Sequence, residues 1–365
     1  MKKTALATGF FLLFSLVLEA QESVEYTPST LFPVYGQAFE ASDEHPYRRL
    51  PESLQEVVRE PLWSLGCNSS GLYVRFRSDA PEIHARWVNN GNHMPHMTDC
   101  GTGGLDLYAL ISDEWKYVGS GFNWGASSPS HERRLVGNME PVMREYMLYL
   151  SLYDGVKSLE IGTEKGSVLE GPAVDSPRSD KKIVMYGTSI LQGGCANRPG
   201  MAFTGIIGRW LDREVVNLGF SGNAHLDPEI AELMIQVDNP GVFVLDYVPN
   251  CTAERINEKG ERFFRIIRDA HPDVPVIFVE NPVYTNSPYD QQIKERMDAS
   301  NAAQLALYTK LKKAGEKKLF YIPCDDLIGH DGEATIDGTH FTDLGMVRYA
   351  EEVTPVIKKA LKKSR

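Results

Sequence analysis

The sequence predicts two domains in succession, an all-β sandwich followed by a doubly wound α/β domain with a parallel sheet. The chain has 365 residues, more than the roughly 250–300 residues at which a single hydrophobic core stops growing. In the first half, apolar and polar residues alternate with the period of a half-buried strand. In the second half, short unbroken apolar runs alternate with longer helical segments, which is typical of strands that are covered on both faces.

The extreme N-terminus predicts a signal peptide over residues 1–20. Lys2 and Lys3 precede an apolar run from Ala5 to Leu18, and Ala20 suits the residue before cleavage. The alternative, a membrane anchor, is disfavoured because the run is shorter than the roughly 20 residues that span a bilayer. We therefore expect a secreted or periplasmic protein without stable membrane insertion after signal removal.

Residues 21–171 are predicted to form the β-sandwich, of jelly-roll-like type. The segments 72–76 and 146–150 alternate regularly, and the runs 105–111 and 114–118 are separated by a short turn. Only residues 50–59 suggest a helix in this part. Residues 172–182, rich in Pro, Ser and charge, are then predicted to be a linker.

Residues 183–365 are predicted to form a flavodoxin-like domain with a five-stranded parallel sheet. The predicted strands are the apolar runs 183–186, 215–218, 242–245, 276–279 and 319–322. The predicted helices include 227–236, 252–270 and 289–314, which have helical spacing and caps.

Composition excludes one class of partner. The formal net charge is −11, and contacts to phosphate backbones require clustered Lys and Arg, so nucleic acid is not expected as a partner.

Polar residues follow three of the predicted strands and precede the last helix. Ser189 follows the first strand, Gly222 the second and Asn250 the third, while Asp337 and His340 come just before the final helix. Because ligands bind beyond the carboxyl ends of parallel strands, we expect these residues to meet at one rim.

Their types match the needs of acyl transfer. A serine hydroxyl requires an imidazole base that a carboxylate orients, and Asp337 lies three residues before His340. The N–H groups of Ser189 and Gly222 and the side-chain amide of Asn250 are candidate donors to the oxyanion. The alternative, that the Gly-rich turn after the first strand binds a phosphate or a flavin, leaves Asp337 and His340 unexplained.

The same residues carry a family resemblance. Gly187-Thr-Ser189, Ser221-Gly222-Asn223, Pro249-Asn250 and Asp337-Gly-Thr-His340 resemble, in this order, the four blocks of the SGNH/GDSL hydrolase family. The resemblance covers residues 181–365. It implies Ser189 as the nucleophile, Asp337 and His340 as the rest of the triad, and Ser189, Gly222 and Asn250 as oxyanion donors.

A second, narrower resemblance concerns the N-terminal half. Gly104-Leu-Asp-Leu-Tyr108 is similar to the Gly-x-Asp-Leu-Tyr domain, a β-sandwich found ahead of some SGNH hydrolases. Relatives of this shape include carbohydrate esterases that remove acetyl groups. Together with the predicted signal peptide, the resemblance leads us to expect a secreted serine esterase that acts on small acyl esters of a small molecule or polysaccharide and needs no cofactor or metal.

Two alternative functions stay open at this point. One is a non-catalytic carbohydrate-binding or scaffold protein, and the other is a lipase or acylhydrolase for longer acyl chains.

Several further residues are candidates for secondary roles. His93 and His96 lie in a loop that either reaches the substrate pocket, holds a metal together with Asp99 and Cys100, or is purely structural. Arg198 is a candidate for substrate contact or for a surface salt bridge. Cys195 and Cys251 lie in loops that should be neighbours, so they are candidates for a disulfide in an exported protein, the alternative being two small buried thiols.

Overall fold

The structure, a computed structural model, describes residues 24–122 and 128–364. The predicted signal peptide, residues 1–20, lies outside the described residues. Among the described helices, none combines the length and apolar character needed to cross a membrane.

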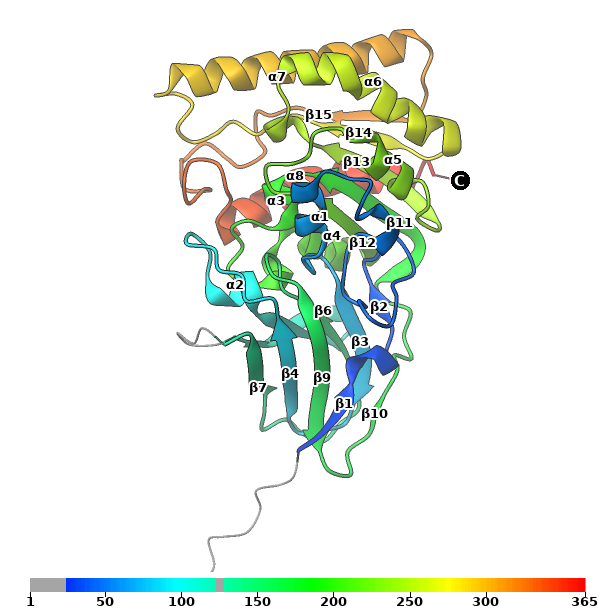
Figure 1. The fold of residues 1–365 in the computed structure, drawn as a ribbon, viewed down its shortest axis with the longest axis vertical. Coiled ribbons are helices and arrows are strands. Elements are labelled where there is room, and N and C mark those ends of the chain that lie inside the picture. The colour runs from blue at the N-terminus through cyan, green and yellow to red at the C-terminus, as the bar shows by residue number, and fades with distance from the viewer. Residues whose placement is uncertain (1–23, 123–127, 365) are drawn as a thin grey trace, which may run out of the picture.

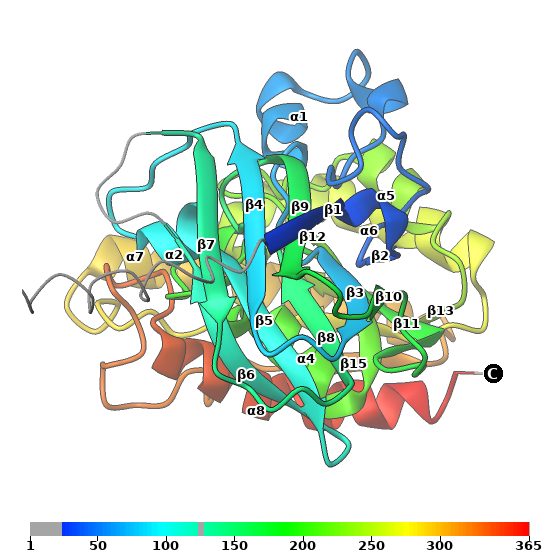
Figure 2. The same cartoon turned by 90° about the horizontal axis from the view of Figure 1, so that it is seen from below.

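Two antiparallel sheets form the N-terminal domain, which confirms the predicted sandwich (Figures 1 and 2). Buried side chains of both sheets, among them Phe76, Trp87 and Ile161, share one core. The first sheet has the order β1 (Val24–Pro28), β9 (Val156–Glu164), β4 (Ile83–Asn89) and β7 (Ser130–Val136). The second has the order β10 (Leu169–Glu170), β3 (Tyr73–Ser78), β8 (Arg144–Tyr149), β5 (Leu105–Ile111) and β6 (Glu114–Gly121), with β2 (Val34–Tyr35) beside β3.

The helix predicted at residues 50–59 is wrong in position. The structure has a 3₁₀ turn at Glu52–Leu54, and helix α1 spans Glu60–Gly66. Pro61 stands in the first turn of α1, where a missing N–H costs nothing and the fixed φ favours helix. The proline therefore places the helix start after the predicted segment.

Five parallel strands form the sheet of the second domain, as predicted. Their order is β12 (Arg213–Gly219), β11 (Arg178–Gly187), β13 (Pro240–Asp246), β14 (Val276–Val279) and β15 (Leu319–Ile322). Side chains of β11 alternate between two cores, with Val184 and Tyr186 on one face and Ile183 and Met185 on the other. This two-sided burial explains the unbroken apolar runs in the sequence.

Helices cover both faces of this sheet. Helices α5 (Pro228–Met234), α6 (Ala253–Ala270) and α7 (Gln291–Lys313) pack on one face, and α6 and α7 form the layer farthest from the sandwich (Figure 1). Helices α3 (Ser189–Gln192), α4 (Phe203–Leu211) and α8 (Asp343–Leu361) pack on the other.

The predicted linker is shorter than expected, because β11 begins at Arg178. Arg178 pairs with Arg213 of β12, and after a register shift Ile183 pairs with Val215. Residues 178–182 stay polar because they form the partly exposed start of the strand.

The two domains are joined by buried contacts. Arg49 is almost fully buried and donates to the carbonyl oxygens of Gly219 (2.6 Å) and Leu65 (2.6 Å). Leu50 and Leu62 belong to the same core as Val184 of β11. Residues from the N-terminal half thus complete one face of the α/β domain.

Candidate active site

Ser189 is the first residue of the short helix α3, directly after β11. Thr188 caps this helix, its hydroxyl accepting from the N–H of Ile190 (3.3 Å), and Gly193 ends it with a φ of +112°. The tight strand-to-helix turn leaves Ser189 6% exposed, with its hydroxyl at the rim of the sheet. Because Ser189 lies in the first turn, its N–H has no partner further back in the helix.

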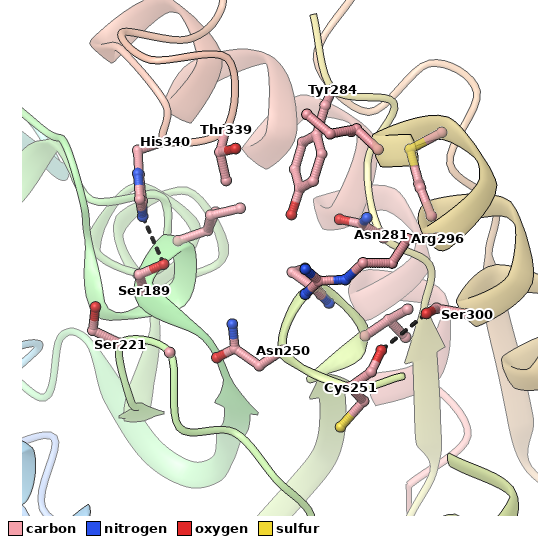
Figure 3. Close-up of a pocket in the computed structure, with 16 residues that line it drawn as sticks. Ser189, Ser221, Asn250, Cys251, Asn281, Tyr284, Arg296, Ser300, Thr339 and His340 are labelled. Atoms are coloured by element: carbon pink, nitrogen blue, oxygen red, sulfur yellow. Dashed lines mark hydrogen bonds between the residues drawn. The ribbon is translucent and has the colours of Figure 1, made fainter. Parts of the chain in front are cut away.

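A continuous hydrogen-bond chain joins the three residues that sequence reasoning placed together. The Ser189 Oγ lies 2.9 Å from His340 Nε2, and His340 Nδ1 lies 2.7 Å from Asp337 Oδ2 (Figure 3 draws the serine–histidine bond). The other carboxylate oxygen of Asp337 accepts from the N–H groups of Thr339 (3.0 Å) and His340 (2.8 Å). The loop therefore holds both the carboxylate and the imidazole in fixed orientation.

The environment of Asp337 keeps this carboxylate charged. Partial burial opposes the charged form, but hydrogen bonds from the His340 ring and from the backbone of His340 and Thr339 outweigh burial. The pKa of the Asp337 carboxyl consequently lies below its ordinary value.

A cavity of about 380 Å³ opens in front of Ser189 and His340 (Figure 3). Its volume is in the range of pockets that hold small ligands. The remaining lining residues are Ile190, Ser221, Gly222, Val248, Pro249, Asn250, Cys251, Asn281, Tyr284, Ile293, Arg296, Met297, Ser300 and Thr339.

The predicted oxyanion donors Gly222 and Asn250 both line this cavity. Gly222 has a φ of +66°, and its N–H makes no hydrogen bond with any residue that the structure describes. The neighbouring N–H of Ser221 is occupied, since it donates to Gln192 Oε1 at 3.0 Å. Gly222 therefore presents the free backbone donor of this loop.

The side-chain amide of Asn250 is held in place through its oxygen atom. Its Oδ1 accepts from the N–H of Ala224 (3.2 Å), which turns the Nδ2 group toward the cavity on the Ser189 side (Figure 3). This hydrogen bond fixes which end of the amide faces the substrate. Pro249, in the 3₁₀ turn Val248–Asn250, does not prevent this orientation.

The wall opposite Ser189 contains three polar residues that sequence reasoning missed: Asn281, Tyr284 and Arg296. Asn281 and Tyr284 lie in the loop after β14, so the search at strand ends that found Ser189 would also have found them. Arg296 gives no such signal, because its position in the cavity depends on how α7 packs.

Comparison with known proteins places the chain in a family. The sequence profile described as the GDSL-like lipase/acylhydrolase family matches residues 180–358, and the profile of the GxDLY N-terminus of SGNH-hydrolase-type esterases matches residues 24–169. The structure of a GDSL-like lipase from Bacteroides ovatus ATCC 8483 is 32% identical, with a TM-score of 0.88 over 93% of this chain and 98% of that chain.

The chain belongs to the GDSL-like lipase/acylhydrolase family. It is a serine hydrolase that acts on ester bonds, and both family resemblances noted in the sequence are confirmed.

More distant structures share the fold. A salicylyl-acyltransferase from a tetracycline biosynthetic pathway is 16% identical, with a TM-score of 0.75 over 93% of this chain and 98% of that chain. A family two carbohydrate esterase from Clostridium thermocellum, in complex with cellohexaose, is 13% identical, with a TM-score of 0.58 over 81% and 94%. A search of curated proteins found no significant match.

Arg198 does not line the cavity of this hydrolase, which corrects its prediction as a substrate contact. Its Nη1 donates to Asp106 Oδ2 and to the Tyr108 hydroxyl, both at 2.6 Å. Asp106 and Tyr108 are the Asp and Tyr of the Gly-x-Asp-Leu-Tyr motif, and Asp106 also accepts from the N–H of Gly200 (2.9 Å). The motif thus attaches the sandwich to the loop that follows α3.

The loop with the two histidines reaches the α/β rim, but only one histidine approaches the site. The ring centroids of His96 and His340 lie 5.4 Å apart. The side chain of His93 is 72% exposed, its Nδ1 lies 3.9 Å from Asp99 Oδ1, and it is not among the residues that line the cavity, so its substrate contact stays a prediction.

The predicted metal alternative does not form as proposed. Among the described residues, the grouping that brings ligand atoms within 4.8 Å of one another is His96, Cys195 and His340, without His93, Asp99 or Cys100. Both ring nitrogens of His340 are already engaged by Ser189 and Asp337.

The predicted disulfide between Cys195 and Cys251 is absent, since both are free thiols. The Cys195 thiol lies near the rings of His96 and His340. The Cys251 thiol instead donates a hydrogen bond to the carbonyl oxygen of Ala224 at 3.2 Å. Burial raises the pKa of both thiols to about 12, which keeps them protonated.

Proposed function

We propose that this protein hydrolyses small acyl esters, acetyl esters above all, of carbohydrates. The observation that carries the proposal is the hydrogen-bonded chain Asp337–His340–Ser189, with its serine end facing a cavity of about 380 Å³. The carbohydrate part is supported by a neighbour in fold that is a carbohydrate esterase in complex with cellohexaose.

The first half of the reaction acylates the serine. His340 Nε2 takes the proton of the Ser189 hydroxyl as Oγ attacks the ester carbonyl, and Asp337 stabilises the imidazolium that forms. The negative charge that develops on the carbonyl oxygen is met by the N–H of Ser189, the N–H of Gly222 and the Nδ2 group of Asn250. His340 then gives its proton to the departing alcohol.

The second half releases the acyl group. Water enters the cavity, His340 accepts its proton, and the resulting hydroxide attacks the acyl-enzyme carbonyl. The same donors stabilise the second oxyanion. As this intermediate collapses, the bond between the acyl carbon and Ser189 Oγ breaks, His340 returns its proton to Oγ, and the free acid leaves. Every proton movement is carried by residues of this chain.

A substrate panel tests the acyl and alcohol preference. Acetylated saccharides should be turned over faster than butanoyl and octanoyl esters of the same sugars, and Ser189→Ala should remove turnover of all of them. Preference for the octanoyl esters would instead support the lipase alternative, and sugar binding without any turnover would support the non-catalytic one.

We also propose that the protein is exported, from the basic and apolar pattern of residues 1–20. Sequencing of the mature N-terminus is expected to begin at residue 21 or close to it. A cytoplasmic protein that starts at residue 1 would contradict this proposal.

A further inference from the structure

One wall of the cavity carries a cation that faces the nucleophile. Arg296, from α7, points into the cavity opposite Ser189 and lies close to Asn281 and Tyr284 (Figure 3). Among the described residues that line the cavity, Arg296 is the one with a permanent charge.

Within the part of the chain that the structure describes, the exposed side chain of Arg296 has no protein partner for its charge. It forms no hydrogen bond or ion pair with any residue in the described part of the chain, although the protein is strongly acidic. Lys294, on the same helix, is by contrast paired with Asp298. The five N–H donors of the Arg296 guanidinium are therefore available to a ligand.

A buried acceptor lies beside this cation. Asn281 is 4% exposed, and its backbone is fixed by hydrogen bonds with the Asn301 side chain (2.8 and 3.1 Å). Its side-chain Oδ1 is buried without a hydrogen-bond partner. Since buried polar atoms are nearly always satisfied, this oxygen calls for a donor such as a hydroxyl group from a bound ligand.

Tyr284 adds a third polar group to the same wall. Its hydroxyl faces the cavity (Figure 3). Burial raises the pKa of the phenol above its ordinary value, and the Arg296 charge and the neighbouring Asn281 side chain offset this rise only partly. The phenol therefore stays protonated and can donate a hydrogen bond. A cation, an acceptor and a donor together suit a ligand that has both a carboxylate and hydroxyl groups.

We propose that this wall binds the alcohol part of the substrate, and that this alcohol is an acidic sugar, an O-acylated uronic acid. The inference rests on the proposed esterase function. Arg296 pairs with the sugar carboxylate in the bidentate geometry that guanidinium groups favour, while Asn281 and Tyr284 bind its hydroxyls. A neutral sugar would leave Arg296 unpaired.

Matched model esters test the charge preference. The substrates are an O-acetylated methyl glucuronoside, the methyl glucoside acetylated at the same hydroxyl, and a methyl glucoside hemisuccinate, whose carboxylate is on the acyl group. The wild type should favour the glucuronoside over the glucoside acetate by about 10- to 100-fold in kcat/KM, mainly through KM, the factor expected of a charge-assisted hydrogen bond.

Two variants show whether the preference for the acidic sugar comes from Arg296 itself or from the positive charge of the helix in general. Arg296→Gln should reduce that ratio to near one, and 0.5 M NaCl should reduce it partly in the wild type. Lys294→Gln removes the same charge from the same helix outside the cavity and should keep the wild-type ratio. Equal ratios in the wild type and Arg296→Gln, or a preference for the hemisuccinate, would overturn the proposal.

Binding measurements distinguish failure of this proposal from failure of the esterase function. In a Ser189→Ala background, calorimetry should show tighter binding of the glucuronoside than of the glucoside, and Arg296→Gln should remove the difference. If the wild type hydrolyses none of the esters but this binding difference is seen, the esterase proposal fails and the acidic-sugar site stands. If the wild type hydrolyses the esters but the Ser189→Ala protein binds both sugars with equal affinity, the esterase function stands and the acidic-sugar site fails.

Discussion

The oxygen and the nitrogen of the Asn250 side-chain amide have different roles. The side-chain carbonyl is held by the N–H of Ala224, and the amide nitrogen is thereby presented to the space in front of Ser189. A donor that is fixed before the reaction needs no reorganisation when charge develops, which is why such donors contribute strongly to catalysis.

Replacing Asn250 by Asp tests the role of the nitrogen while it keeps the role of the oxygen. The aspartate keeps an oxygen that accepts from Ala224 but loses the donor to the oxyanion. We expect kcat to fall by at least about 10²- to 10³-fold with a much smaller change in KM, because one oxyanion donor is lost and the aspartate adds a negative charge beside the oxyanion. Steady-state kinetics on an acetyl ester provide the measurement, and a kcat within threefold of the wild type would remove Asn250 from the oxyanion site.

At the scale of elements, Asp246 connects the end of β13 to α8. Its carboxyl is buried and accepts a hydrogen bond from the Tyr349 hydroxyl at 2.9 Å. Burial outweighs this hydrogen bond and raises the pKa of Asp246 to about 8. The carboxyl is therefore neutral in the folded protein over a range in which the unfolded chain has already ionised.

This difference gives the free energy of unfolding a definite pH dependence. Between about pH 4, the ordinary pKa of Asp, and about pH 8, the folded state binds the extra proton, so stability falls as pH rises. The stabilisation that comes from the raised pKa of Asp246 is complete below this pH window and lost at its upper end. Asp246→Asn cannot titrate, so its melting temperature should fall less than that of the wild type between pH 5 and pH 8. If the melting temperatures of the two proteins instead change equally with pH, Asp246 is charged in the folded protein.

The elements also show what local patterns can and cannot predict. The five strands were predictable because burial on both faces leaves an unbroken apolar signal in the sequence. The prediction of a helix at residues 50–59 was wrong because it followed the helical spacing of those residues and ignored Pro61. This proline favours a helix that starts next to it, and α1 does start there. The triad was predictable from strand ends, and Asn281 follows the same rule.

Contacts between distant segments were not predictable in this way. Arg198 pairs with Asp106, 92 positions earlier, and nothing near either residue in the sequence identifies the other. The placement of Arg296 in the cavity and the separation of Cys195 from Cys251 likewise depend on packing that no local pattern records.

At the scale of the whole molecule, the Gly-x-Asp-Leu-Tyr motif joins the two domains. Asp106 is fully buried, while the Arg198 side chain is 23% exposed. Removing one partner of a buried ion pair leaves the other charge uncompensated. The motif therefore acts on stability and on the position of the sandwich, at a distance from the reacting atoms.

Arg198→Ala is expected to lower the free energy of unfolding by about 3 kcal/mol, the lower end for such a deletion, because Arg198 is partly exposed. The matched control is Arg178→Ala, which breaks an exposed pair with Asp212 and should cost less than about 1 kcal/mol. Denaturant unfolding measures both values. A raised KM in Arg198→Ala with unchanged stability would contradict this role and return Arg198 to the substrate site.

The whole mechanism depends on Ser189, activated by His340 and Asp337, being the nucleophile of an esterase. The most direct measurement is treatment with a fluorophosphonate, which reacts with activated serines, followed by mass mapping of the labelled peptide. We expect one label on Ser189 that is absent in Ser189→Ala and strongly reduced in His340→Ala. An unlabelled Ser189 in a folded protein, or equal labelling in His340→Ala, would contradict this mechanism.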